Sequence, residues 1–344
     1  MKAAVFRGIG DVRIEDVPEP EAGPEDVVVE VSMCGICGTD LHTYVHGRLV
    51  ESGQVMGHEF SGRVISAGDA VVGVTVGDRV TATGIVPCET CPRCVEGRTN
   101  LCHTAWSTAI AFGRPGAFAQ RVRIPRPTLG KTIFKLDDNV SDEAGATVEP
   151  LAVGVHAVKL APGIKGGTAL VLGLGPIGQQ IVQVLRAYGA RRVIGVEISP
   201  LRLSIARELG AEAVDGSPGV EQALADVLGD DAIDVVFECS GVPALATAAL
   251  DVVRAGGTVV TVAVYGSPAA PNPNVIVAKE LRYLGSIAYT SEDYADAIEL
   301  LRTGQVRADA LINRHERLDD IGAAFQVQLE KEHALRILVT PNSD

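Results

Sequence analysis

The stretch "VLGLGPIG" follows a short aliphatic run and opens a helical pattern, with glycines at Gly173, Gly175 and Gly178. In a strand–turn–helix unit the first glycine makes a tight turn, and the second lets the backbone approach a pyrophosphate. The third glycine lets the helix pack closely against the strand. This spacing, in this position between strand and helix, predicts a dinucleotide-binding site.

The segments around this turn alternate between strands and helices. The strand-like runs are "RVIGVEI", "IDVVFECSG", "GTVVTVAVYG" and "LRYLGSIAY". Helical patterns lie between them: "IGQQIVQVLRAYG", "SPLRLSIARELG" with Ser199 as N-cap, and residues 242–254. Such alternation is typical of an α/β fold with a doubly wound parallel sheet.

The residues around the turn indicate which dinucleotide binds. Pro176 and Ile177 open the helix whose free N–H groups would face the phosphates. Glu197, nineteen positions after Gly178 at the end of the next strand, would accept both ribose hydroxyls and repel a 2′-phosphate. The sequence therefore favours NAD over NADP. Arg202 either packs over the adenine or balances surface charge.

The rest of the chain has a different pattern of predicted strands and helices. Up to about residue 150 short strands such as "EDVVVEVSM", "SGRVISAG" and "VGVTVGDRVTA" are separated by turns. After about residue 288 one amphipathic helix, "SEDYADAIELLRTG", precedes mixed segments. We expect a β-rich domain from residues 1–150 and 288–344, with the dinucleotide domain inserted at residues 151–287.

Charge and composition restrict the partners and the compartment. A net charge of −13 argues against nucleic acid and against an anionic membrane surface. The sequence has no apolar run long enough for a membrane span and no secretory pattern at its start. We therefore expect a cytoplasmic protein, in which thiols stay reduced.

The loop "PCETCPRCVEGRTNLC" contains four of the seven cysteines, Cys88, Cys91, Cys94 and Cys102. Disulfides between cysteines so close would be strained, and the compartment disfavours them. An iron–sulfur cluster is chemically possible, but the sequence lacks the other ligand runs of an electron-transfer protein. Tetrahedral structural zinc suits the spacing best, and four thiolates leave no open coordination position for chemistry.

A reaction therefore needs a second site, for which the candidates are Cys37, His58, Glu59 and Glu149. Each lies close to glycine or proline near the end of a strand-like run, where distant segments can converge. Each alone has an ordinary explanation, as a buried thiol, a hydrogen-bonded imidazole or a helix-capping acid. Together with the dinucleotide turn and the cysteine loop they indicate a catalytic metal site.

Over nearly its whole length the sequence resembles the zinc-dependent medium-chain alcohol dehydrogenases. "GHEFSGRVISAGDAV" is similar to that family's zinc signature, and the cysteine loop and "GLGPIG" follow in the expected order. Ethanol-type enzymes have a second cysteine at the position of Glu149. A glutamate at this position resembles the polyol, butanediol and threonine branch of the family. "CGICGTDLH" resembles the butanediol and sorbitol enzymes, whereas "GRPGAFAQ" resembles the threonine enzymes, so the sub-branch stays open. The resemblance implies a GroES-like catalytic domain and a Rossmann domain.

The resemblance also implies roles for the residues of the second site. Cys37 and His58 would hold a catalytic zinc, with Glu59 and Glu149 completing its shell, one directly and the other through water. Asp40 would accept a hydrogen bond from His58 and fix its tautomer. With the zinc of the cysteine loop, we expect two zinc ions per chain. Cys34 is expected to be a buried bystander.

The implied reaction is oxidation of a secondary alcohol to a ketone, or the reverse. Thr39 would take the departing proton and pass it through the cofactor ribose to His42 and solvent. Without the resemblance, Thr39 would be an ordinary turn hydroxyl and His42 a surface imidazole.

The substrate is the least determined part. We expect the segments of Tyr44, His46, Trp106 and Phe112 to border the cleft. These segments contain few charged residues, which favours a small neutral alcohol or diol as substrate. Trp106 and Phe112 fit an ordinary core equally well. A threonine-3-dehydrogenase-like activity and a catalytically silent NAD-binding sensor are the alternatives. "GTVVTVAVYG" and "LRYLGSIAY" are apolar enough to pair subunits as a homodimer or homotetramer.

Overall fold

The computed structural model describes residues 1–330 and 334–342, and the chain divides into two compact units. The first unit comprises Met1–Ala152, Tyr289–Gly304 and Ile312–Asp344, and the second comprises Val153–Ala288 and Gln305–Leu311. The short segment Gln305–Leu311 departs from the expected division. It belongs to the second unit because Arg307 N donates to Gln183 Oε1 at 2.8 Å and Arg307 forms an ion pair with Glu208 at 3.0 Å.

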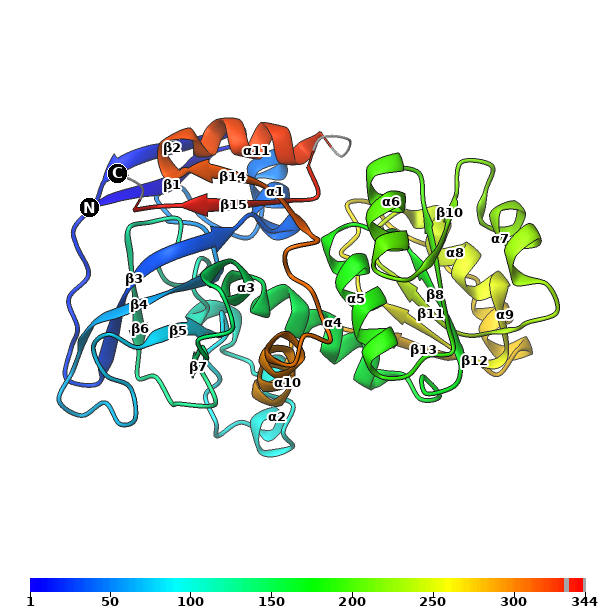
Figure 1. Cartoon of the computed structure of the whole chain (residues 1–344), viewed down its shortest axis with the longest axis horizontal. Helices are drawn as coiled ribbons and strands as arrows, with labels where there is room; N and C mark the ends of the chain where they lie inside the picture. Colours follow the sequence, from blue (N-terminus) through cyan, green and yellow to red (C-terminus); the bar gives the residue numbers. More distant parts are fainter. Residues whose placement is uncertain (331–333, 343–344) are drawn as a thin grey trace. The chain divides into compact units, whose positions relative to one another are not determined.

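The first unit is built on a mostly antiparallel sheet with the strand order β14-β15-β3-β4-β5-β7, in which β6 also pairs with β3; a separate hairpin joins β1 to β2 (Figure 1). The strands are β1 Lys2–Gly8, β2 Asp11–Asp16, β3 Asp26–Gly35, β4 Glu59–Ala67, β5 Arg79–Ala82, β6 Arg121–Pro125, β7 Ile133–Lys135, β14 Ile312–Arg317 and β15 Arg336–Thr340. The alternating valines of β3 place Val27, Val29 and Val31 in the core of this unit.

The prediction of a strand over "VGVTVGDRVTA" is mostly wrong, because only the end of this segment, Arg79–Ala82, forms a strand. Gly73 and Gly77 have φ angles of +79° and +97°, which interrupt an extended chain. Between them Thr75 N donates to Asp78 Oδ2 at 2.8 Å and closes a turn. Val72, which the pattern places in a strand, is 81% exposed.

Short helices and turns of helix fill the loops of the first unit. They are α1 Gly38–His46, α2 Pro92–Val95, η1 Thr99–Leu101, η2 Trp106–Thr108, α3 Asp142–Ala146, α10 Ser291–Arg302, η3 Leu318–Asp320 and α11 Ile321–Leu329. The amphipathic pattern predicted α10, which begins with a capping box between Thr290 and Asp293.

The second unit contains the expected parallel sheet, with strand order β10-β9-β8-β11-β12-β13. Its strands are β8 Thr168–Leu172, β9 Arg192–Glu197, β10 Glu212–Asp215, β11 Ile233–Glu238, β12 Val253–Thr261 and β13 Arg282–Gly285. The order reverses between β8 and β11, which is the switch point where doubly wound folds bind ligands. The α/β prediction is confirmed.

Helices cover both faces of this sheet. They are α5 Pro176–Ala187, α6 Pro200–Glu208, α7 Val220–Leu228, α8 Pro243–Val252 and α9 Pro273–Ala278, preceded by α4 Val148–Leu160. Helices α5 and α6 pack together, and α7 and α9 both pack against α8, so two layers enclose the strands (Figure 1). Ser199 occupies the predicted N-cap of α6, although its side chain makes no capping hydrogen bond.

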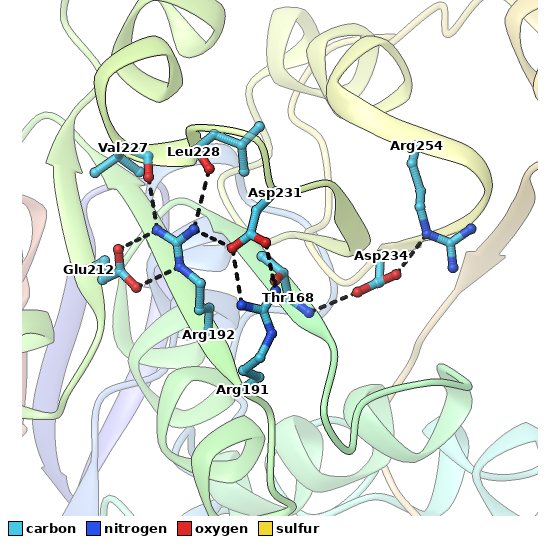
Figure 2. Close-up of polar contacts among 9 residues, drawn as sticks. All are labelled: Thr168, Arg191, Arg192, Glu212, Val227, Leu228, Asp231, Asp234 and Arg254. Carbon is cyan, nitrogen blue, oxygen red and sulfur yellow. Dashed lines mark hydrogen bonds and ion pairs between the residues drawn. The ribbon is translucent and has the colours of Figure 1, made fainter.

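Charged residues join the amino ends of the strands, at the edge opposite the glycine turn (Figure 2). Arg192 donates to both oxygens of Glu212, at 2.9 and 2.6 Å, and to Asp231 at 2.6 Å. It also reaches the carbonyls of Val227 and Leu228, and Asp231 binds Arg191 as well. This network holds the sheet together away from the cofactor edge, so we assign it a structural role.

Among the described residues, no helix is both long and apolar enough to cross a membrane.

Candidate functional site

The site in the first unit begins with the residue that starts helix α1. Cys37 is the N-cap, and its Sγ accepts the backbone N–H of Thr39 at 3.5 Å. Asp40 completes a capping box by accepting the backbone N–H of Cys37 at 2.9 Å. The sequence "CGTD" therefore fixes the orientation of the Cys37 sulfur through its own local hydrogen bonds.

Strand pairing brings a second segment to this sulfur. Strands β3 and β4 run antiparallel with Gly35 opposite Glu59, so the end of β3 lies beside the start of β4. The ligand atoms of Cys37, His58 and Glu59 consequently lie within 4.8 Å of one another. His58 and Glu59 are buried. These three predicted residues are brought together from segments more than twenty residues apart.

Asp40 lies beside the imidazole of His58 without a hydrogen bond to it. Asp40 Oδ1 is 3.8 Å from His58 Nδ1, and this nitrogen is buried with no hydrogen-bond partner. Burial raises the pKa of Asp40 to about 6. Burial would lower the pKa of His58, but the surrounding carboxylates raise it. The site thus concentrates negative charge around one imidazole.

Glu149, near the start of α4, is a buried neighbour of this group. Burial raises its pKa to about 7, while the proximity of His58 opposes the rise. The neighbouring Tyr289 side chain also opposes the rise in the pKa of Glu149, and the Tyr289 hydroxyl accepts the backbone N–H of Gly84 at 3.0 Å. Tyr289 could not be predicted from the sequence, because its place beside Glu149 depends on segments far apart in the chain.

The donor set fits zinc. A thiolate, an imidazole and carboxylates are the ligands that zinc takes, and a site with fewer than four tight protein ligands keeps a position open. A thiol, an imidazole and a carboxylate whose ligand atoms lie within 4.8 Å of one another, with the buried carboxyl groups of Asp40 and Glu149 beside them, are what a divalent cation would satisfy. A cation of this kind therefore suits the residues present.

Aromatic side chains form one wall of this site. The ring of Phe112 lies 5.3 Å from that of His58, and Trp106 meets Phe112 edge-on at 5.4 Å. Trp106 is 48% exposed, so neither ring is simply buried core. Tyr44, in contrast, was wrongly expected at the cleft. It packs against Phe325 at 5.1 Å within the hydrophobic core, because it lies on the buried face of α1.

The proton-relay candidates lie on the same helix. Thr39 Oγ1 is 3.6 Å from Cys37 Sγ. His42 follows three residues later, on the same side of α1. Burial, and then the charges of His46 and Arg48, lower the pKa of His42, which favours the neutral imidazole.

The cysteine loop forms a separate cluster in the first unit. Cys94 Sγ lies 4.0 Å from Cys88 Sγ and 3.5 Å from Cys91 Sγ, and Cys88 N donates to Cys102 Sγ at 3.3 Å. All four predicted thiols therefore gather. The four ligand atoms that all lie within 4.8 Å of one another are those of Cys88, Cys91, Cys102 and His103, so His103 stands in this group in place of Cys94.

In the second unit the glycine turn has the geometry that its spacing predicts. Gly173 has a φ angle of +87°, and a side chain on Gly178 would collide with the Gly173 carbonyl oxygen. Gly175 is the N-cap of α5, followed by Pro176 and Ile177 in the first turn. The free N–H groups of this helix end are available to an anion.

Glu197 ends β9 beside this turn. Its carboxylate accepts the backbone N–H groups of Leu174, Ile198 and Ser199 at 3.0, 2.8 and 3.2 Å. Arg202 Nη1 lies 3.7 Å from Glu197 Oε2, and burial lowers the pKa of Arg202. Glu197 and Arg202 therefore face each other at the edge of the dinucleotide turn.

Comparison with known proteins decides what these two units are. Residues 23–134 match the family model described as the alcohol dehydrogenase GroES-like domain, and residues 176–303 match that described as zinc-binding dehydrogenase. The chain belongs to the zinc-dependent alcohol dehydrogenases. The expected GroES-like and Rossmann domains are confirmed, as is an enzyme that uses zinc and a nicotinamide cofactor.

The relatives of this dehydrogenase lie in the polyol and butanediol branch. (R,R)-Butanediol dehydrogenase of Bacillus subtilis is 36% identical over 99% of this chain and 100% of its own length. Sorbitol dehydrogenase of the same organism is 32% identical over 99% of this chain and 98% of its own length. The crystal structure of 2R,3R-butanediol dehydrogenase from Bacillus subtilis superposes with a TM-score of 0.90, at 34% identity and 99% coverage of both chains. A Sinorhizobium meliloti zinc-binding dehydrogenase solved with NADP has a TM-score of 0.88 at 35% identity, again over 99% of both chains.

Proposed function

We propose that this dehydrogenase interconverts a small neutral secondary alcohol or vicinal diol and the corresponding ketone, with NAD as hydride carrier. The observation that carries the proposal is the convergence of Cys37, His58 and Glu59 within 4.8 Å in a site walled by Phe112. The names of the butanediol and sorbitol relatives support the substrate class.

Cys37 and His58 would hold the catalytic zinc, and Glu59 and Glu149 would complete its shell. When bound, zinc supplies a Lewis acid that makes the substrate hydroxyl more acidic, and the nicotinamide supplies the hydride acceptor. The four cysteines of the loop would hold a second, structural zinc.

The residues of α1 would carry the proton. The Thr39 hydroxyl lies next to the Cys37 sulfur and would accept the proton from the substrate hydroxyl. His42, whose lowered pKa favours the neutral imidazole, would accept the proton further along this path and release it to solvent.

Two features of the site favour a neutral substrate. They are the aromatic wall and the buried guanidinium of Arg336. Phe112 and Trp106 offer apolar surface beside His58. The nearby guanidinium of Arg336 is already paired with Glu59 at 2.7 Å, so it is not free to take a substrate carboxylate. An amino acid substrate such as threonine fits this arrangement less well than a diol.

The choice of NAD rests on Glu197. Three backbone N–H groups orient its carboxylate, whose Oε2 accepts only one of them and so keeps a lone pair for a ribose hydroxyl. Its negative charge would repel a 2′-phosphate.

The subunits would associate through the sheet of the second unit. Strand β13 is one of the two edge strands of this sheet, whereas β12, the other segment expected to pair subunits, lies one strand inside. Tyr283 on β13 and Ile287 after it are 37% and 38% exposed. An exposed edge with apolar side chains favours pairing with a second copy, so we propose a homodimer or homotetramer. We also propose a cytoplasmic location, in keeping with free cysteines.

The test is nicotinamide reduction across a panel of alcohols, each assayed with NAD and with NADP. The panel contains the 2,3-butanediol stereoisomers, sorbitol, glycerol, threonine and simple secondary alcohols. The proposal predicts the highest kcat/KM for a butanediol or another small diol with NAD. Threonine as the best substrate would contradict the proposed substrate class. A preference for NADP would contradict the proposed cofactor.

A further inference from the structure

The last residue of β11, Glu238, is a fully buried carboxylate that the proposed reaction does not use. Its Oε1 accepts the backbone N–H groups of Ser240 at 2.8 Å and Gly241 at 3.2 Å, and also the Ser240 hydroxyl. Its Oε2 accepts the hydroxyl of Tyr265 at 2.5 Å. Four donors thus converge on one carboxylate, and a buried charge is tolerated only with such partners.

These donors come from two different loops at the carboxyl edge of the sheet. Ser240 and Gly241 belong to the loop after β11, and Tyr265 belongs to the loop after β12. The loops are in close contact, because a Cβ on Gly241 would lie 3.0 Å from the Val264 carbonyl oxygen. Gly241 also has a φ angle of +69°, so this close approach requires glycine. The two oxygens of Glu238 therefore hold one loop each.

The first of these loops supports the dinucleotide turn. A Cβ on Gly173 would lie 2.9 Å from Ser240 Cα, so the first glycine of the turn rests directly on Ser240. The backbone N–H of Cys239 donates to the Leu172 carbonyl at 2.9 Å, immediately before that glycine. A displacement of Ser240 would therefore be transmitted to the turn that receives the pyrophosphate.

The Glu238 side chain is linked to the second loop by a single hydroxyl, in addition to the backbone N–H groups of Val262 and Ala263, which donate to the Glu238 carbonyl at 2.9 and 3.2 Å. Burial, followed by the hydrogen bond to Glu238, raises the pKa of Tyr265. The phenol therefore remains a donor, and its bond to the carboxylate is charge-assisted. Removing this hydroxyl leaves the loop after β11 bonded to the Glu238 carboxylate, whereas the loop after β12 keeps only its bonds to the Glu238 backbone carbonyl.

We propose that Glu238 and Tyr265 are positioning residues for the nicotinamide cofactor, which fix the glycine turn and the two loops in the arrangement that binds the dinucleotide. They act through Ser240 and Gly173 and do not need to touch the cofactor. This role is independent of which alcohol the enzyme oxidises.

The test compares Tyr265→Phe and Glu238→Gln with Tyr283→Phe in the zinc-loaded enzyme. Tyr283 is the matched control, because its hydroxyl contacts Thr261 Oγ1 at 3.2 Å on the neighbouring strand. We would measure the dissociation constant of NADH by its fluorescence, kcat and KM for NAD, and the melting temperature without cofactor. We expect Tyr265→Phe to raise the dissociation constant and the KM by up to about tenfold, as for the loss of one charge-assisted hydrogen bond. We expect kcat at saturating NAD to change by less than about twofold.

The same measurements can overturn the proposal. A dissociation constant in Tyr265→Phe equal to that of Tyr283→Phe, with only the melting temperature lowered, would show that the contact merely stabilises the fold. Should Glu238→Gln fail to fold, Tyr265→Phe and Ser240→Ala decide the matter, because each removes a single hydroxyl. A reduced kcat with an unchanged dissociation constant would also contradict the proposed role.

Discussion

Arg336 Nη2 lies 2.7 Å from Glu59 Oε2, and the two side chains are 1% and 2% exposed. Arg336 opens the last strand, β15, and its guanidinium also donates to the Ala146 carbonyl at 3.0 Å. Glu59 is one of the donors of the candidate catalytic zinc site. The chain's last strand is therefore tied to the metal site through a buried ion pair.

Replacing only one partner of this pair should be far more costly than replacing both. Arg336→Met leaves Glu59 buried without its cation, and we expect a loss of about 3–5 kcal/mol in the free energy of unfolding. The double variant Arg336→Met/Glu59→Gln should lose much less than the sum of the two single variants. Urea unfolding of all four proteins gives the coupling. Additive losses would mean that the pair contributes no interaction energy.

The cysteine loop should lose its zinc when one thiolate is removed. In Cys102→Ser we expect zinc content to fall from two to one per chain, because a structural site needs all four ligands. His103→Ala is the matched control, since His103 is the next residue and also lies near the sulfurs. This variant should keep both ions. Loss of an ion from His103→Ala would contradict a site made of four thiolates.

The proposed proton path predicts opposite results for two substitutions of Thr39. Thr39→Ala should lower kcat by about 10²–10⁴, the usual contribution of a positioned proton carrier. Thr39→Ser keeps the hydroxyl and should keep most of the activity. His42→Ala should be slower than wild type and should recover when imidazole is added as buffer. Equal rates for the alanine and serine variants of Thr39 would indicate a packing role for its methyl group.

The aromatic wall should determine how tightly a small diol binds. Phe112→Ala removes the ring beside His58, and we expect KM for 2,3-butanediol to rise several-fold with little change in kcat. Trp106→Phe keeps an aromatic ring beside Phe112 and serves as the control. An unchanged KM ratio between butanediol and sorbitol in Phe112→Ala would show that this wall does not select the substrate.

The amino-end network of the second unit should affect stability without affecting catalysis. Arg192→Met removes five hydrogen bonds around a largely buried guanidinium, and we expect the unfolding free energy to fall by about 1–2 kcal/mol. Arg13→Met, which breaks only an exposed pair with Asp11, should cause no measurable change. Cofactor affinity should be the same in both variants. A weaker affinity in Arg192→Met would mean that the two edges of the sheet are coupled.

The features that could be predicted from the sequence are local in the chain. The glycine turn and the cysteine loop each lie within one short stretch of chain, so the spacing of their residues predicts which groups come together. Glu197 was predictable because the strand–turn–helix unit has a regular length. The alternating strands and helices of the second unit were predictable for the same reason.

The features that were missed depend on distant residues. Arg336, Tyr289 and Tyr265 acquire their roles only when their strands or loops fold beside Glu59, Glu149 and Glu238, respectively. Each has an ordinary identity in an ordinary sequence context. The false strand before Arg79 has the opposite cause, because the valine alternation there is real but the two glycines adopt positive φ angles.

The assignment of the catalytic zinc site is tested by comparing Cys37, the N-cap of α1, with Cys34, which lies near the end of β3. The measurement is zinc per chain together with NAD reduction by 2,3-butanediol, on wild type, Cys37→Ala and Cys34→Ala. We expect two zinc ions and turnover in wild type and in Cys34→Ala, and one zinc ion without turnover in Cys37→Ala. Retention of both zinc and activity in Cys37→Ala would contradict the assignment of the catalytic site.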